Sequence, residues 1–99
     1  MPAPIVLINM FEVSGGMEHE FVEWWKNCSE ALKKEPGFID ARLHRNLTSA
    51  SRFQFINVAH WETEEAFVEA RARNKDIMQG NSGWKGNPAL YEVSVSYYS

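Results

Sequence analysis

The sequence has little cysteine, little excess charge and no long apolar run, and each shortage excludes a class of protein. A single cysteine, Cys28, excludes an intramolecular disulfide framework and favours a reducing compartment. A net charge of −3 gives no electrostatic basis for binding nucleic acid or an anionic membrane. No apolar run approaches the ~20 residues of a membrane span, and the start lacks a basic signal-peptide region. We therefore expect a cytoplasmic protein with no membrane or nucleic-acid partner.

Motifs for metal, phosphate and nucleophile chemistry are also missing. His19, His44 and His60 lie on three separate predicted elements, and no pair has the spacing of metal ligands on a helix. The Gly15-Gly16 pair is only a turn signal, and Cys28 lies on the apolar stripe of a predicted helix, as an inert core thiol would. We expect no metal and no other cofactor.

The chain contains enough apolar material for one core. Its 99 residues are 44% hydrophobic and 13% aromatic, which predicts a single domain, residues 1–99, with a ring-lined interior. Apolar spacing and Gly/Pro signals predict, in order, a strand at 4–13, a helix at 17–34, strands at 38–45 and 52–61 joined by a polar turn at 46–51, a helix at 64–73, a short helix at 74–79, a loop at 80–88 and a strand at 89–98.

This βαββαβ order predicts a ferredoxin-like α+β sandwich, with a four-stranded antiparallel sheet and both helices on one face. In that topology the first and third strands are central neighbours. Strand alternation then defines the faces. The helix-side positions are Ile5, Leu7, Asn9, Phe11 and Val13 on the first strand and Phe55, Asn57, Ala59 and Trp61 on the third; the second strand alternates Ile39, Ala41 and Leu43 against Asp40, Arg42 and His44.

The opposite face of the predicted sheet is too apolar for water. It carries Val6, Ile8, Met10, Ile56, Val58 and His60. An exposed apolar sheet face of this size is typical of an interface. We expect a homodimer that forms sheet to sheet with two-fold symmetry, with His60 as an interface residue.

Asn57 is the anomaly of the helix-side face. Burial of an amide without partners costs roughly 2–7 kcal/mol, so a carboxamide among aromatic side chains bonds to something specific. That partner is either a neighbouring backbone group or a ligand. Asn9 is expected to lie close to Asn57, and two carboxamides that converge in an aromatic core are more typical of a site than one alone.

The segment FINVAHW running into ETEEAF, preceded by Glu35-Pro36-Gly37-Phe38 and Arg45, resembles the antibiotic biosynthesis monooxygenase (ABM) domain family. The resemblance extends from Val6 to Val95 and implies a dimeric α+β barrel. One branch of that family oxidises polycyclic phenols or anthrones to quinones without a cofactor, using an Asn and a Trp with three residues between them. Asn57 and Trp61 fit that spacing, whereas Phe67 stands where that branch has a Tyr.

A second branch degrades heme. It uses an Asn on the first strand, which Asn9 matches, and a Trp on the second helix, where this chain has Ala70. It also uses a later His as the iron ligand, and no His follows His60. Heme degradation is therefore disfavoured.

Our functional hypothesis is a small monooxygenase that oxidises an aromatic, phenol-like molecule with dioxygen. Asn57 and Trp61 would be catalytic hydrogen-bond donors to the substrate oxygen. The substrate-binding set would be Asn9, Phe11, Phe21, Trp25, Phe55, Phe67 and Trp84, with Trp84 either a lid or a plug in the partner's core. Two alternatives stay open: a binding module for an aromatic ligand that performs no reaction, and a scaffold whose pocket is filled by core side chains.

Overall fold

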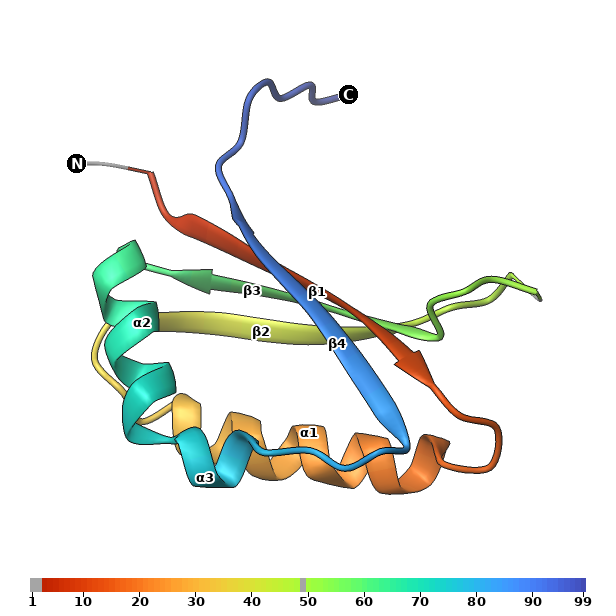
Figure 1. The fold of residues 1–99 in the computed structure, drawn as a ribbon. Coiled ribbons are helices and arrows are strands. Elements are labelled where there is room, and N and C mark those ends of the chain that lie inside the picture. The colour runs from red at the N-terminus through yellow and green to blue at the C-terminus, as the bar shows by residue number, and fades with distance from the viewer. Residues whose placement is uncertain (1–2, 49) are drawn as a thin grey trace.

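All helices lie on one side of a single sheet (Figure 1). The structure is a computed structural model and describes residues 3–48 and 50–99. Its elements are β1 (Ile5–Val13), α1 (Glu18–Leu32), β2 (Phe38–Arg45), β3 (Phe55–Trp61), α2 (Glu64–Arg73), α3 (Lys75–Met78) and β4 (Trp84–Tyr91). Residue 49, within the predicted turn at 46–51, lies outside the described residues.

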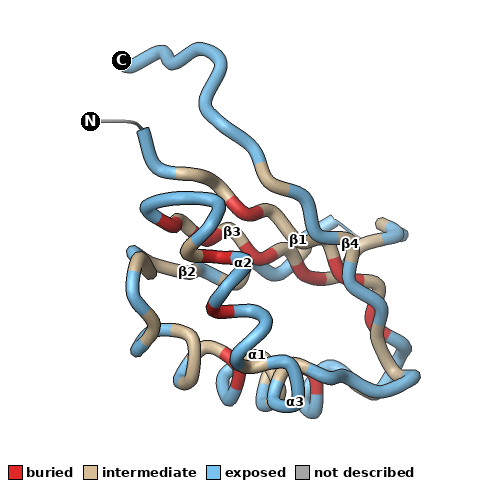
Figure 2. The backbone as a smooth tube through the Cα atoms, turned by 60° about the vertical axis from the view of Figure 1, so that its left-hand side comes forward, coloured by how far each residue is buried: buried red, intermediate tan, exposed pale blue. Residues whose placement is uncertain are grey.

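The sheet has the strand order β2-β3-β1-β4, and every pair is antiparallel. The central position of β1 and β3 confirms the predicted ferredoxin-like α+β fold. Leu7 pairs with Ala59, Asn9 with Asn57 and Phe11 with Phe55, so the side chains expected to share a face do so. Buried residues gather on these two strands and on α1 and α2 (Figure 2).

Local sequence explains where the helices begin and end. Thr63 is the N-cap of α2, since its side-chain oxygen accepts a hydrogen bond of 3.0 Å from the backbone N–H of Ala66. The chain turns after α1 at Gly37, whose φ of +88° is a left-handed conformation that favours glycine. The carbonyl of Gly37 accepts a bond of 2.8 Å from the N–H of Glu62, which ties this turn to the start of α2.

Two clusters of side chains form the core between the sheet and the helices. The Trp61 cluster contains Leu7, Ala59, Trp61, Phe67 and Ala70, with Leu32 and Phe38 packed against it. The Phe21 cluster contains Phe11, Val13, Phe21 and Phe55, with Trp24 and Trp84 packed against it. Trp61 and Phe21 are the largest fully buried side chains, so each cluster is built around one aromatic anchor.

The predicted position of the last strand is wrong. We expected a loop at 80–88 and a strand at 89–98, but β4 runs over Trp84–Tyr91 and residues 92–99 form no strand. Pairing with β1 overrides the loop-like composition, and β4 tolerates Pro88 because it is an edge strand. Trp84 therefore packs against Phe21 and Trp24 of its own chain, with ring centroids 5.6 Å and 5.4 Å away. It is the first residue of β4, and not a loop residue as predicted.

The predicted alternation of β2 also fails at its start. A register shift between Phe38 and Asp40 inserts Ile39, which is 46% exposed instead of facing the helices with Ala41. Phe38 takes the inward place and packs edge-on against Trp61, with ring centroids 5.3 Å apart. The bulge thus exchanges one apolar side chain for a larger one in the core.

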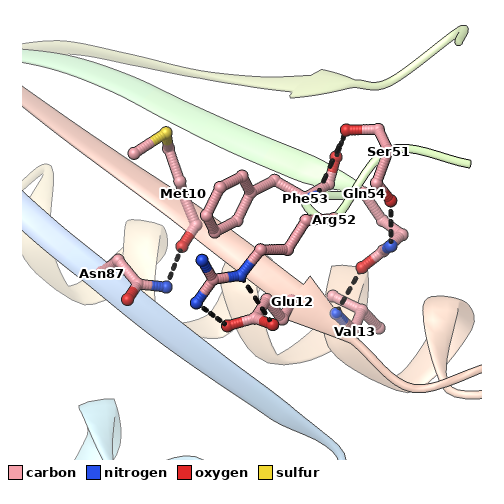
Figure 3. Close-up of polar contacts among 8 residues, drawn as sticks. All are labelled: Met10, Glu12, Val13, Ser51, Arg52, Phe53, Gln54 and Asn87. Carbon is pink, nitrogen blue, oxygen red and sulfur yellow. Dashed lines mark hydrogen bonds and ion pairs between the residues drawn. The ribbon is translucent and has the colours of Figure 1, made fainter.

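Polar side chains secure β4 and the segment before β3 to β1 (Figure 3). The amide of Asn87 donates to the carbonyl of Met10 at 2.9 Å, and the side-chain oxygen of Gln54 accepts from the N–H of Val13 at 2.6 Å. Arg52 lies 3.2 Å from the carboxylate of Glu12, and this hydrogen-bonded contact lowers the pKa of Glu12. Within the described residues, no helix is long and apolar enough to cross a membrane.

The turn at Gly37 generates a stability prediction. A Cβ at this position would lie 2.5 Å from the Cβ of Ala66, and the left-handed φ adds strain. We expect Gly37→Ala to lower the free energy of unfolding by about 1–3 kcal/mol, measured by urea denaturation. Gly15→Ala is the matched control, because nothing lies within 4 Å of a Cβ there. Equal stability of the two variants would contradict the prediction.

Candidate functional site

A pair of asparagines occupies the centre of the helix-side face of the sheet. Asn9 on β1 and Asn57 on β3 are register partners, so the two carboxamides lie side by side. Asn57 is the buried polar residue of the core, at 9% exposure. On one side of the pair lie the rings of the Trp61 cluster, and on the other those of the Phe21 cluster. The pair therefore forms a polar row between two apolar clusters.

A cavity of about 60 Å³ lies between this row and the helices. Its wall is mostly apolar. The lining residues are Leu7, Asn9, Phe11, Phe38, Ala41, Asn57, Ala59 and Trp61 from the sheet, and Trp24, Trp25, Cys28, Ser29, Leu32, Phe67 and Met78 from the helices. Aromatic walls around two amides suit a flat molecule with a polar edge.

The side chain of Asn9 is fixed by β4. Its oxygen accepts a hydrogen bond of 2.7 Å from the backbone N–H of Asn87. A backbone N–H can only donate, so the amide orientation is set and the NH₂ remains as a donor. Gly86 makes this arrangement possible, because a Cβ there would lie 3.0 Å from the Asn9 oxygen. Asn9 thus has a structural role in addition to its place in the cavity wall.

The side-chain oxygen of Asn57 is buried and has no hydrogen-bond partner among the described residues. An unsatisfied buried acceptor costs about 1–3 kcal/mol. Such a group in a cavity wall is a point where a ligand hydroxyl or a water would be stabilised. Trp61 lines the same cavity and is 1% exposed, with its ring edge-on to Phe67 at 5.7 Å.

Six of the nine residues predicted for the site line the cavity: Asn9, Phe11, Trp25, Asn57, Trp61 and Phe67. Phe21 and Phe55 do not, because they stack on each other at 4.9 Å inside the Phe21 cluster. The prediction missed Trp24, Cys28 and Met78. Trp24 had a detectable signal, since it follows Phe21 by three residues on one helix face. Met78 had none, because α3 is brought to the cavity by tertiary packing.

A surface cleft of about 320 Å³ adjoins the cavity. The two hollows share the side chains of Asn9, Phe11, Trp24 and Met78. The cleft is completed by Arg71 from α2, by Gly80 and Asn81 from the connection to β4, and by Trp84, Gly86 and Pro88 from β4. This cleft is the outer part of the same site.

A larger hollow of about 520 Å³ lies elsewhere, between the start of α1 and the β2–β3 connection. Glu18, His19, Arg45 and Gln54 are among its lining residues. It contains neither carboxamide of the central pair. We assign the candidate site to the cavity instead, since Asn57, whose side-chain oxygen has no partner among the described residues, lines it.

The cavity wall holds no group that is ionised at neutral pH among the described residues. His60 is on the opposite face of the sheet, where its Nδ1 lies 2.6 Å from the carboxylate of Asp40. Cys28 reaches the cavity, but burial raises the pKa of its thiol to about 11. Its Sγ donates to the carbonyl of Ile77 at 3.6 Å. The site therefore offers amide, indole, thiol and, from Ser29, hydroxyl groups, and no ionised proton acceptor among the described residues.

Comparison with known proteins identifies the family. The antibiotic biosynthesis monooxygenase (ABM) profile matches residues 4–75. The chain belongs to this family. No curated protein sequence matches this ABM protein. Among solved structures, it is similar to a candidate monooxygenase from Shewanella loihica PV-4, with 32% identity, a TM-score of 0.87, and 97% of this chain and 99% of that chain covered.

Two further structures of different activity share the fold. SnoaB, a cofactor-independent oxygenase from Streptomyces nogalater, has 19% identity and a TM-score of 0.77, with 96% and 97% of the two chains covered. MhuD, a heme degrader from Mycobacterium tuberculosis solved with two hemes in its active site, has 27% identity and a TM-score of 0.69, with 96% and 100% covered. Proteins that share this fold therefore carry out different reactions, so the reaction has to be inferred from the residues of the site.

Heme does not fit the residues that line this cavity. No imidazole is among them: His19 lines the separate hollow, and His44 and His60 lie on β2 and β3 and do not line the cavity. The second-helix position of the heme branch's Trp is Ala70, which is fully buried in the Trp61 cluster. We therefore derive no chemistry through heme iron.

The buried thiol gives a prediction that checks the described packing. Because burial raises the pKa of Cys28 from 9.0 to about 11, thiolate is scarcer in the folded chain. At pH 8 we expect iodoacetamide to alkylate folded Cys28 at least ~100-fold more slowly than the urea-unfolded chain, followed by mass spectrometry. The raised pKa also implies stability that is complete below pH 9 and is lost as the pH rises towards about 11. Rapid alkylation of the folded protein would refute this placement.

Proposed function

We propose that this ABM protein is a cofactor-independent monooxygenase that oxidises a phenolic or anthrone-like aromatic molecule to a quinone. The observation that carries the proposal is the orphan oxygen of Asn57 beside Asn9 in an aromatic-walled cavity. A ring system would lie between the aromatic side chains, with its oxygen substituent at the amide pair. Membership of a monooxygenase-type family supports the class of reaction.

The proposed reaction requires no electron donor besides the substrate. Deprotonation of an anthrone-type substrate gives an electron-rich enolate, which transfers an electron to dioxygen, and the two radicals combine into a peroxide at carbon. Loss of water then leaves a carbonyl. Overall a CH₂ group and O₂ become C=O and H₂O, so the substrate supplies all four electrons. The protein has to exclude water, orient the ring and stabilise the oxyanion.

Asn9, Asn57 and Trp61 would stabilise that oxyanion. The NH₂ of Asn9 is free to donate, since its oxygen is held by β4. The amide of Asn57 has no partner that fixes its oxygen, so it can turn to donate its NH₂ to an oxyanion or accept from a hydroxyl. With no proton acceptor evident in the wall, these donors would act by making the bound substrate more acidic. We expect the rate to rise with pH.

A second candidate is a binding module that holds the same ligand without reaction. Phe67 favours it, because its ring lines the cavity where the quinone-forming branch has a hydroxyl. The inner cavity is also small, so only part of a ligand would fit there, and a reaction that encloses the whole molecule is not needed to explain the site. Oxygen consumption separates the two candidates.

The decisive variants are Asn57→Ala and Trp61→Phe. We expect oxygen uptake with anthrones, naphthols or hydroquinones to fall about 100- to 1000-fold in Asn57→Ala and less in Trp61→Phe, because each loses one oxyanion donor. The measurement is an oxygen-electrode assay above the uncatalysed rate. Asn27→Ala on the exposed side of α1 is the matched control and should keep wild-type uptake. Full activity of Asn57→Ala would end the monooxygenase proposal.

We also propose that the protein is a homodimer formed through the outer face of the sheet. No helix of the described residues covers this face, and in both views the segment 92–99 leaves the sheet on the side away from the helices (Figures 1 and 2). Val6, Ile8, Ile56 and Val58 make the face apolar, although each is only partly buried. Val95 of the terminal segment is 72% exposed, which adds apolar surface for a second copy to cover.

A charged residue in the outer face should separate the two copies. We expect Ile56→Glu to convert a dimer into a monomer at micromolar concentration, because the carboxylate would be buried unpaired at the interface. Light scattering after size exclusion gives the mass. Val68→Glu, at a 55% exposed position of α2, should remain dimeric. A monomeric wild-type protein would remove the proposal.

A further inference from the structure

We infer that Arg71 binds a carboxylate of the substrate in the cleft outside the cavity, so that the substrate class is an aromatic hydroxy acid. The inference rests on the proposed function, because it places the hydroxyl end of the same molecule at Asn9 and Asn57. Arg71 would be a specificity residue that contacts the end of the substrate remote from the reacting atoms.

The sizes of the two hollows favour a ligand that spans both. The inner cavity of about 60 Å³ is far below the ~300–1,000 Å³ typical of ligand sites, whereas the adjoining cleft of about 320 Å³ reaches that range. Phe11, Trp24 and Met78 border both hollows. Met78 is a flexible side chain that can move aside for a ring. A molecule with its hydroxyl at the amide pair therefore has its other end in the cleft.

The cleft has one charged side chain among the described residues that line it, and that is Arg71. The guanidinium group presents donors in a planar fork that matches a carboxylate. The remaining lining is apolar or neutral, so an anion in the cleft would meet no like charge there. Charge and shape together favour a carboxylate over a neutral substituent.

Arg71 is also not held by an ion pair among the described residues, unlike its neighbour Arg73. Two residues further along α2, Arg73 lies 2.7 Å from Glu35 and 3.9 Å from Glu69. Arg71 makes no ion pair within 4 Å with any residue in the described ranges, and the residue four positions later is Lys75. Asp76 borders a neighbouring hollow with Arg71 but does not line the cleft. The guanidinium is thus available to a ligand.

Neutral donors in the same wall give independent support. The indole N–H groups of Trp24 and Trp84 are buried without an acceptor among the described residues. The oxygen of Asn81 accepts from the N–H of Gly83 at 2.7 Å, which leaves the Asn81 NH₂ as a donor. Three residues that line the cleft thus carry side-chain donors without a partner, and an acceptor-rich ligand could bind these donors once the side chains turn towards it.

The test is isothermal titration calorimetry with 6-hydroxy-2-naphthoic acid and its methyl ester, which differ in the charge of one end. We expect the wild-type protein to bind the acid at least about tenfold more tightly than the ester, because a charged hydrogen-bonded pair forms only with the acid. Arg71→Gln should bring this ratio close to one. Arg73→Gln removes the same charge from the same helix and should keep the wild-type ratio.

Salt gives a second measurement that needs no variant: raising NaCl from about 0.05 to 0.5 M should weaken binding of the acid more than of the ester. A wild-type ratio near one, an unchanged ratio in Arg71→Gln or no binding of either compound would overturn the inference. An Arg71-dependent ratio without oxygen uptake would reject the monooxygenase reaction and keep the carboxylate site. Oxygen uptake that depends on Asn57, together with equal binding of the acid and the ester, would keep the monooxygenase reaction and reject the carboxylate site.

Discussion

The burial of two carboxamides at the centre of the sheet is the constraint on which the site depends. Asn9 and Asn57 are register partners between two aromatic clusters, and the fold satisfies only part of their hydrogen-bonding capacity. The stability lost at the orphan oxygen is of the order of 1–3 kcal/mol. Small residues lie next to both asparagines: Gly86 leaves room beside Asn9, and Ala59 is the next residue after Asn57 on the same face of β3.

From this centre outward the site changes in polarity in a definite order. The inner wall is neutral, since its carboxamides and the Cys28 thiol carry no charge at neutral pH. Indole and amide donors follow, and a cation, Arg71, lies at the surface. A ligand that entered would leave water for aromatic walls before it met the amide pair. Because neighbours of this fold include an oxygenase and a heme degrader, such details distinguish members better than the fold does.

The order of the elements was predictable because it depends on local signals. Alternation fixed β3 with Asn57 inward, and Thr63 marked the start of α2. The errors arose where tertiary pairing overrides local composition. β4 begins at Trp84 within a Gly/Asn/Pro-rich stretch, because β1 offers a full set of partners there. The bulge at Ile39 follows from pairing with β3, which alternation cannot detect. The cleft combines α2, α3 and β4, so no single segment could reveal it.

The two outer strands carry features that oppose aggregation through the edges of the sheet. An open sheet edge is a template on which further strands can add indefinitely. β4 carries Pro88, which lacks a donor, and β2 carries the bulge at Ile39 with Arg42 beyond it. Each device interrupts the regular edge that strand addition requires. Growth along the sheet is thereby disfavoured, whereas the proposed stacking of one apolar face on another would stop at two copies and give a closed assembly.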